Sequence, residues 1–150
     1  MKTNNPHRIG ALQRLEAFVG AWREEVAGAD GNAGTMTFEW ALDRQFLLQR
    51  SELADPEFPD SFGIIAVAED GSYTQHYFDS RGVVRVYAMD LTDGTWTLVR
   101  DAPDFTPLDF SQRFIGKFAP DGATITGAWQ TATDGGDWQR DFDLTYTRIK

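Results

Sequence analysis

Side chains capable of acid–base or anion-binding chemistry are few in this chain, and most of them are arginines and tyrosines. Arg85 and Tyr87 stand two residues apart, so on a β-strand both side chains point to the same face. A guanidinium beside a phenol suits a carboxylate, an enolate or a phenolate, because both groups donate strong hydrogen bonds to an oxyanion. His76 is the only histidine beyond the N-terminal tail, and an imidazole can move a proton near neutral pH.

The sequence excludes several other kinds of chemistry. It contains no GxSxG, HExxH, GxGxxG or P-loop motif. It has no cysteine, which excludes a disulfide framework, a thiolate zinc site and a cysteine nucleophile. His7 and His76 are too few for a multi-histidine metal site, and Asp134, Asp137 and Asp141 lack the spacing of a calcium-binding EF-hand loop. We therefore expect no metal and no cofactor.

The charge of the chain limits its partners. The net charge is −9, and the 14 basic residues are 11 arginines and 3 lysines. An acidic surface repels phosphate groups, so we expect a small-molecule partner and no binding to nucleic acid or to a membrane. Formation of a homodimer remains possible at this net charge. The first 20 residues lack the apolar core of a signal peptide, and no window reaches the roughly 18 apolar residues of a membrane span. These features favour a cytoplasmic protein.

One helix is predicted at the start of the chain, over residues 8–19, after a flexible tail at 1–7. Its apolar residues recur at three- or four-residue spacing: Ile9, Leu12, Leu15, Phe18 and Val19. Gly20 follows as a stop signal.

After Gly20, apolar and polar residues alternate with the period of two that is typical of β-strands. Turn-forming dipeptides punctuate the alternation: Asp30-Gly31, Asp70-Gly71, Arg81-Gly82, Asp93-Gly94, Asp121-Gly122 and Asp134-Gly135. Ten strands are predicted, near residues 21–28, 34–42, 45–53, 61–68, 72–79, 83–90, 94–100, 108–118, 123–131 and 138–149. The chain 1–150 is thus one all-β domain, an antiparallel up-and-down sheet that closes into a barrel of about ten strands. A two-sheet sandwich is the alternative architecture.

Two short motifs at the ends of the predicted sheet resemble the calycin superfamily, which includes lipocalins, fatty-acid-binding proteins and nitrobindin-like proteins. They are Gly20-Ala21-Trp22 on the first strand and Tyr146-Thr147-Arg148 on the last. The resemblance implies a calycin-like barrel in which the indole of Trp22 packs across the closed end. It also implies that Arg148 lies over the indole ring and joins the first strand to the last.

Four longer runs, 76–79, 82–87, 110–114 and 141–148, resemble a family of uncharacterised bacterial lipocalin-like proteins, and the likeness extends over nearly the whole chain. The pair Arg85 and Tyr87 is similar to the Arg-x-Tyr pair that holds the carboxylate in fatty-acid-binding proteins. Nitrobindin-like proteins hold haem through a histidine near the C-terminus. Residues 143–150 contain no histidine, so we expect no haem held in that manner.

The apolar side of each strand predicts which residues face the barrel interior. Those residues are Phe38, Trp40, Phe46, Leu48, Trp96, Leu98, Phe110, Phe114, Trp129, Phe142, Leu144 and Tyr146. Polar side chains that share these faces, together with aromatics near the open end, form the predicted ligand site: Trp40, Arg50, His76, Arg85, Tyr87, Arg100, Gln112, Trp129 and Tyr146. Loops 55–60 and 101–107 carry Phe58 and Phe105 between prolines and are candidate lids.

A mostly apolar interior with a few polar groups is typical of a small-molecule site. The leading hypothesis is binding of a hydrophobic or amphipathic, anionic organic molecule in the barrel interior. The alternative is an isomerase or cyclase that uses His76, the candidate catalytic residue, with arginine and tyrosine groups. A structural domain with a filled interior is a third interpretation, in which the arginines lie outside beside carboxylates and His76 is structural.

Overall fold

The computed structural model describes residues 5–28, 33–133 and 136–149. Its elements in chain order are α1 (Pro6–Arg14), the 3-10 helix η1 (Leu15–Phe18), β1 (Gly20–Val26), β2 (Gly34–Ala41), β3 (Phe46–Glu52), β4 (Ser61–Val67), β5 (Tyr73–Asp79), β6 (Val84–Thr92), β7 (Thr95–Arg100), β8 (Ser111–Phe118), β9 (Thr124–Ala132) and β10 (Gln139–Arg148). The predicted helix and all ten predicted strands are present, with ends within three residues of those predicted.

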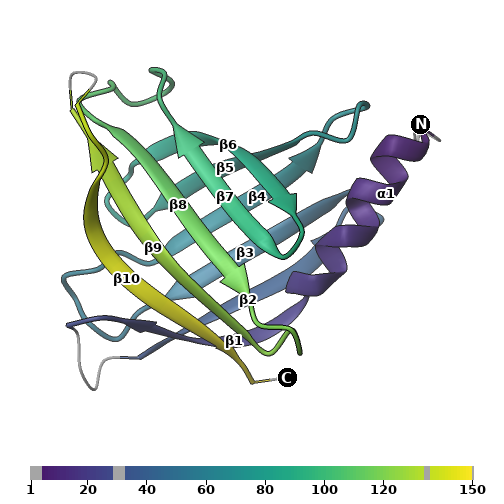
Figure 1. Cartoon of the computed structure of the whole chain (residues 1–150), viewed down its shortest axis with the longest axis horizontal. Coiled ribbons are helices and arrows are strands. Elements are labelled where there is room, and N and C mark those ends of the chain that lie inside the picture. Colours follow the sequence, from purple (N-terminus) through teal and green to yellow (C-terminus); the bar gives the residue numbers. More distant parts are fainter. Residues whose placement is uncertain (1–4, 29–32, 134–135, 150) are drawn as a thin grey trace.

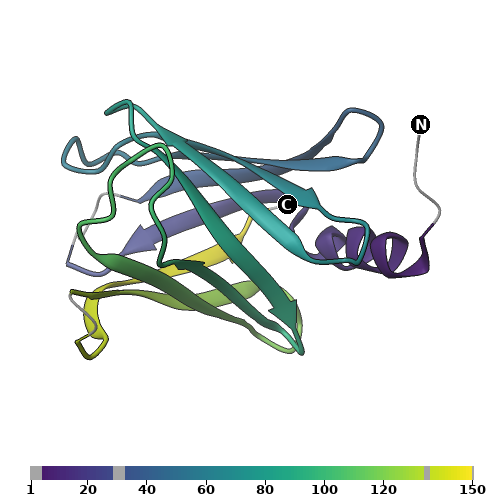
Figure 2. The same cartoon turned by 90° about the horizontal axis from the view of Figure 1, so that it is seen from above.

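The ten strands form a closed barrel in which each strand pairs with its neighbours in the sequence and β1 pairs with β10. Every pairing is antiparallel. Figure 1 shows the strands running obliquely along the barrel, with α1 at one end, and Figure 2 shows the same arrangement from above. The prediction of an all-β up-and-down barrel is confirmed, and closure removes the free sheet edges.

Short turns join the strands at the end that carries the helix. In the β6–β7 turn, Asp93 and Gly94 have φ angles of 52° and 74°, which is the left-handed pair that a two-residue hairpin requires. The turns predicted at Asp30-Gly31 and Asp134-Gly135, and residues 1–4 of the predicted tail, lie outside the described residues.

Helix α1 begins at Pro6, inside the segment that we expected to be a tail. The Oδ1 of Asn5 accepts a hydrogen bond from the backbone N–H of His7 at 2.9 Å, and proline fits the first position of a helix. The described part of the expected tail is therefore a helix start. Ile9, one of the residues of the predicted apolar pattern, is 40% exposed, and the buried residues of α1 are Arg8 and Ala11.

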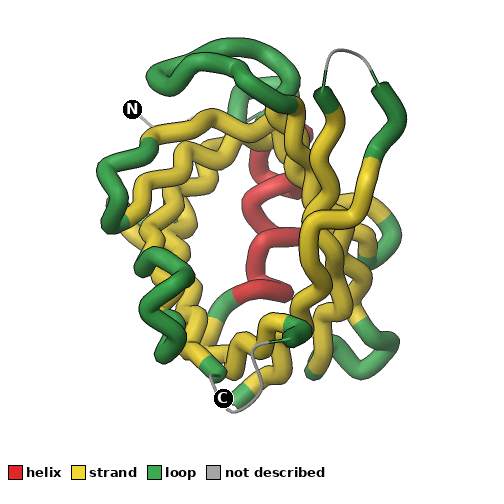
Figure 3. The backbone as a smooth tube through the Cα atoms, turned by 90° about the vertical axis from the view of Figure 1, so that its left-hand side faces the viewer, coloured by secondary structure: helices red, strands yellow, loops and turns green. Residues whose placement is uncertain are grey.

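The helix closes one end of the barrel, as the view along the barrel shows (Figure 3). Arg8 donates from Nε to the backbone carbonyl of Val67 at 3.0 Å. The hydroxyl of Tyr73, at the start of β5, donates to the carbonyl of Ala11 at 2.6 Å. These bonds tie the helix to the β4–β5 side of the wall, and the opposite end of the barrel carries the longer loops.

The seam between the first and last strands is held by Trp22 and Arg148, which are paired across β1 and β10. The Arg148 guanidinium lies 4.2 Å from the centre of the indole. It also donates to the carbonyls of Val19 at 2.7 Å and Ala17 at 2.6 Å. The Trp22 indole N–H donates to the carbonyl of Phe18 at 2.8 Å. The predicted stacking is confirmed, and it ties the barrel seam to η1.

Aromatic side chains fill the half of the barrel next to the helix. Phe18 packs against Phe38 and Trp96, with ring centroids 4.9 Å and 4.8 Å apart, and Trp96 packs edge-on against Phe114 at 4.9 Å. Edge-to-face pairs add to the stabilisation from burial alone. This packing makes a solid floor and leaves the other half of the interior to smaller and polar side chains.

A different kind of contact completes the wall beside β6. The ladder between β6 and β7 runs only from Ala88 to Thr92 of β6. The backbone N–H of Val86 instead donates to the Asp104 carboxylate at 2.8 Å, and the Thr106 hydroxyl donates to the carbonyl of Val84 at 2.8 Å. Side chains of the β7–β8 loop thus replace a missing stretch of backbone pairing.

Within the described residues, no helix is long and apolar enough to cross a membrane.

Replacing Arg148 with alanine tests the seam. Arg148→Ala removes the cation from the Trp22 ring and both hydrogen bonds to the carbonyls of Ala17 and Val19, so we expect a loss of about 2 kcal/mol in the free energy of unfolding. Urea denaturation measures it. Arg140→Ala is the control, since Arg140 lies on the same strand in an exposed pair with Asp143, and it should change stability by less than about 0.5 kcal/mol. Equal losses in the two variants would contradict the role of the seam.

Candidate functional site

A cavity of about 420 Å³ occupies the half of the barrel away from the helix. This volume lies within the roughly 300–1,000 Å³ of small-molecule sites. Apolar side chains line the floor of the cavity: Trp96, Leu98, Phe114, Trp129 and Leu144. The β3–β4 loop lines its mouth with Phe58, whose ring packs edge-on against Phe142 at 6.0 Å.

A pair of glycines sets the position of Phe114 in the floor. Gly116 of β8 and Gly127 of β9 are paired across the two strands. A methyl group on Gly116 would lie 2.7 Å from the Phe114 ring, and one on Gly127 would lie closer still. The ring therefore lies against bare backbone, and the space above it remains part of the cavity.

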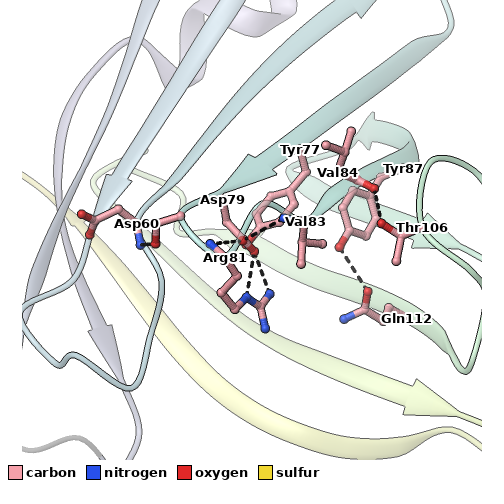
Figure 4. Close-up of polar contacts among 10 residues, drawn as sticks. Asp60, Tyr77, Asp79, Arg81, Val83, Val84, Tyr87, Thr106 and Gln112 are labelled. Carbon is pink, nitrogen blue, oxygen red and sulfur yellow. Dashed lines mark hydrogen bonds and ion pairs between the residues drawn. The ribbon is translucent and has the colours of Figure 1, made fainter.

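One wall of the cavity, which we call the cationic wall, consists of Arg85 and Tyr87 from β6 and Gln112 from β8. The Tyr87 hydroxyl donates to Oε1 of Gln112 at 3.2 Å (Figure 4). The Arg85 guanidinium lies 6.0 Å from the ring of Phe110, and its buried Nε has no hydrogen-bond partner among the described residues. Burial raises the pKa of Tyr87, so the phenol keeps its proton and remains a donor.

A second arginine lies at the mouth but is already paired. Arg81 donates from Nη2 to Oδ2 of Asp79 at 2.6 Å, and the Tyr77 hydroxyl donates to the same oxygen at 2.8 Å (Figure 4). Burial of Asp79 would raise its pKa, but the hydrogen bonds from Arg81 and Tyr77 outweigh it and hold the pKa below the usual value. Asp79 thus stays ionised and neutralises Arg81.

Across the cavity lies a group of residues that we call the acid cluster: Glu24 of β1, Ser51 of β3 and Tyr146 of β10. Glu24 is only 6% exposed, and its Oε1 accepts a hydrogen bond from the Ser51 hydroxyl at 2.5 Å. Burial raises the pKa of the Glu24 carboxyl to about 7, against the opposing effect of this hydrogen bond. Burial, and then the nearby Glu24, hold the pKa of Tyr146 well above its usual value.

A polar bridge crosses the wall between these two groups. Gln75 of β5 donates from Nε2 to Oε1 of Gln49 on β3 at 2.5 Å. The bridge passes over Gly63 of β4, where a methyl group would lie 2.7 Å from the Gln75 amide nitrogen. Oε1 of Gln75 is buried without a partner among the described residues, so the bridge leaves one acceptor unsatisfied.

Five of the nine side chains predicted for the ligand site line the cavity: Arg85, Tyr87, Gln112, Trp129 and Tyr146. The predicted inward face of β6 is therefore correct. Neither Glu24 nor Gln75 was predicted. The signal for Glu24 was present, because Trp22 faces inward and the residue two positions later on a strand shares its face.

The predicted inward face is wrong for two strands. On β3 the buried side chains are Leu47 and Ser51, so Phe46 and Leu48 face outward. Arg50, expected inside, is exposed and pairs with a carboxylate on the outer surface. Both faces of β3 carry large apolar residues, and the pairing register rather than the composition decides which face turns inward.

On β5 the buried residues are Tyr73 and Gln75, and Tyr77 lines the cavity. His76 therefore points to the outer side, and it does not line the cavity. The expectation that His76 faces the interior is wrong, because tyrosine and glutamine fill the space that we assigned to the imidazole.

Two further residues of the predicted site lie elsewhere. Trp40 is at the helix end, where its indole N–H donates to Glu16 at 2.9 Å. Arg100 has the predicted inward face and is 3% exposed, but its guanidinium binds Asp104 at 2.9 Å and 3.0 Å. It shapes the β7–β8 loop and does not line the cavity. Phe105 of that loop, in a predicted lid, is 74% exposed.

Among the residues that the structure describes, no group of three or more histidine, aspartate or glutamate side chains is placed to hold a metal ion.

Comparisons with known proteins give a likeness of fold. No family model matches the chain, and no curated protein matches it. Among solved structures, the crystal structure of Rv2717c from M. tuberculosis matches with a TM-score of 0.61 and 16% sequence identity. The match covers 93% of this chain and 98% of that chain. It shows a shared β-barrel fold.

Adding a methyl group at Gly127 tests how the floor is built. Gly127→Ala forces the Phe114 ring to move, and overpacking of this kind costs about 1–3 kcal/mol, measured by urea denaturation. Adding Phe114→Leu to the same chain should recover part of the loss. Gly10→Ala is the control, because its methyl would meet only an ordinary contact at 3.6 Å. No loss in Gly127→Ala would mean that the ring is free to shift.

The buried carboxyl of Glu24 makes stability depend on pH. The folded chain binds the Glu24 proton more tightly than the unfolded chain, whose pKa is near 4.5, so stability falls as pH rises from about 4.5 through 7. Each pKa unit is worth about 1.4 kcal/mol, so ionised Glu24 costs the fold roughly 3 kcal/mol. Glu24→Gln should remove this loss and gain stability over the natural chain at alkaline pH.

The control for this measurement is Glu25→Gln, because Glu25 is exposed and pairs with Arg23 on the outer surface. Urea denaturation at about pH 5 and pH 8 should show the same pH dependence in Glu25→Gln as in the natural chain. The difference in stability between the natural chain and Glu24→Gln should change between pH 5 and pH 8. An equal difference at the two pH values would contradict the raised pKa of Glu24.

Proposed function

We propose that this protein binds a small amphipathic organic anion in the barrel cavity, with the acidic group of the ligand on the cationic wall. The observation that carries this proposal is Arg85, whose Nε is buried at the cavity without a hydrogen-bond partner among the described residues. Leaving a buried donor unsatisfied costs about 1–3 kcal/mol. A carboxylate bound beside the guanidinium in the cavity would offset that cost through its attraction to the buried positive charge.

The neighbours of Arg85 suit the same ligand. The Tyr87 hydroxyl donates its one proton to Oε1 of Gln112, which leaves the amide N–H₂ of Gln112 as a donor. The Arg85 guanidinium on β6 and this amide on β8 both line the cavity and can bind one oxyanion, and burial strengthens each bond because the effective dielectric constant falls. The aromatic and aliphatic floor supplies the surface for the apolar part of the ligand.

The distribution of charge also favours an anion in the interior. The net charge of the whole chain is −9, and the carboxylates at the cavity mouth, Glu57 and Asp141, are exposed. Exposed charges are screened by salt within about 10 Å, whereas the Arg85 charge acts inside a low-dielectric space. Arg81 is neutralised by Asp79, so Arg85 is the cation that a ligand would meet.

Two alternatives from the sequence lose their support. The hypothesis of catalysis by His76 needs that imidazole in the interior, where the structure places Gln75 and Tyr77 instead. A filled structural barrel is difficult to reconcile with a cavity of about 420 Å³ lined by unpaired polar atoms. Binding is the function that uses both the apolar floor and the cationic wall.

Titration of tryptophan fluorescence tests the proposal, because Trp96 and Trp129 line the cavity. Octanoate, decanoate and benzoate should shift the emission at micromolar to millimolar concentrations, and their methyl esters should bind more weakly. Arg85→Met should weaken the acids by about 1.5–3 kcal/mol, the worth of a hydrogen bond to a charged group, which is about ten- to hundred-fold in Kd. The esters should be almost unaffected.

Arg50→Met is the matched control, since Arg50 lies on the outer surface and its loss changes the net charge equally. It should leave the Kd of every acid unchanged. If Arg85→Met weakened acids and esters equally, or if none of the acids bound, the proposal would be wrong.

A further inference from the structure

The acid cluster lies across the barrel from the cationic wall. In the ring of ten strands, four strands separate β1 from β6 in either direction. Glu24 on β1 and Arg85 on β6 therefore stand on opposite sides of one cavity, and both line it. A ligand anchored at Arg85 thus extends toward Glu24.

The acid cluster has hydrogen-bonding capacity that the protein itself leaves unused. Within the described residues, Glu24 bonds only to Ser51, through Oε1. The Tyr146 hydroxyl, on a side chain only 5% exposed, bonds to no described residue. Glu24 and Tyr146 are direct partners across β1 and β10, so their polar ends share one corner of the cavity. Neither the Tyr146 hydroxyl nor Oε2 of Glu24 is among the fully covered, unpartnered atoms, so a ligand atom in the cavity can reach both.

The surroundings of Glu24 favour its protonated form. The inward faces of the strands beside it carry Met36 and Phe38 on β2 and Gln49 on β3, none of which is charged. Tyr146 on β10 is the titratable group that adjoins it. The charged groups that also line the cavity are Arg85 on the far wall and the mouth residues Arg81, Glu57 and Asp141. The raised pKa of Glu24 has burial as its largest cause, so up to neutral pH the cluster presents hydrogen-bond donors.

We propose that Glu24 and Tyr146 form a second, proton-donating subsite that selects ligands carrying a carbonyl oxygen at the end opposite the acidic group. This inference rests on the proposed function, because it assumes an acid held at Arg85. The ligand class is then an oxo acid of medium length. Its carbonyl oxygen accepts one hydrogen bond from the carboxylic acid of Glu24 and one from the Tyr146 hydroxyl.

The proposal predicts how the affinity for each kind of ligand changes with pH. Once Glu24 ionises, its carboxyl loses the donated proton and repels the lone pairs of a carbonyl oxygen. The affinity for an oxo acid should therefore fall as pH rises through about 7, while a plain acid, which makes no such bond, should change less. An amino acid of the same length, with an ammonium group at that end, should behave in the opposite way, because it would need ionised Glu24.

The test compares three probes of equal length: octanoate, octanoate with an oxo group beside its terminal methyl, and octanoate with a terminal amine. Fluorescence titration of the whole chain at about pH 6 and pH 8.5 brackets the Glu24 ionisation. We expect the oxo acid to bind about tenfold more tightly than octanoate at pH 6, the worth of one to two hydrogen bonds. At pH 8.5 this advantage should disappear.

Two substitutions separate donation from charge. Glu24→Gln keeps a donor that does not titrate, so the tenfold preference should persist at both pH values. Glu24→Leu should remove most of the preference at both pH values while octanoate still binds. Tyr146→Phe should reduce the preference in the natural background. Circular dichroism and urea denaturation show whether each variant is folded. If Glu24→Leu does not fold, Glu24→Gln still provides the test.

The outcomes separate this inference from the proposed function. Octanoate binding that requires Arg85, combined with no preference for the oxo acid, would overturn the second subsite alone. A preference for the amine that grows with pH would overturn it as well, because it would show ionised Glu24 as the binding form. Failure of all three probes to bind would overturn the proposed function itself.

Discussion

Closure of the ring between β1 and β10 is the constraint on which the rest of the structure depends. Once ten strands close into a ring, the diameter of the barrel is set. A barrel of this width is filled only at the end where large aromatic side chains meet. Trp22 and Arg148 hold the closing seam and tie it to η1. The helix and the aromatic floor then fill one end, and the width of the ring leaves a cavity at the other.

The strands and their order could be predicted from the sequence because they depend on local information. Alternation and turn residues fix where a strand begins and ends. The seam joins Trp22 to the distant Arg148, and it was expected only from the resemblance to the calycins. The inward face of a strand is different when both of its faces are bulky. On β5, Tyr77 and His76 are equally plausible interior residues by size, and only the register with β4 and β6 decides between them.

The site could be predicted where one strand supplies neighbouring groups, and not where its chemistry depends on distant ones. Arg85 and Tyr87 share a face by spacing alone. Arg100 was placed correctly on the inner face, yet its partner Asp104 belongs to a loop with no periodic pattern, so its structural role was not visible. Glu24 was missed because a carboxylate is expected at the surface, and only burial inside the ring changes its protonation.

The part of the barrel wall beside β6 is held differently from the rest of the wall. There, the side chains of Asp104 and Thr106 bond to Val86 and Val84 in place of a neighbouring strand. Separating two paired strands breaks a cooperative ladder, whereas moving this loop breaks a few individual bonds. Opening the wall at this flank, next to Arg85, therefore breaks the side-chain bonds of Asp104 and Thr106, with the ion pair between Asp104 and Arg100 as their anchor, while the strand ladders on both sides stay paired.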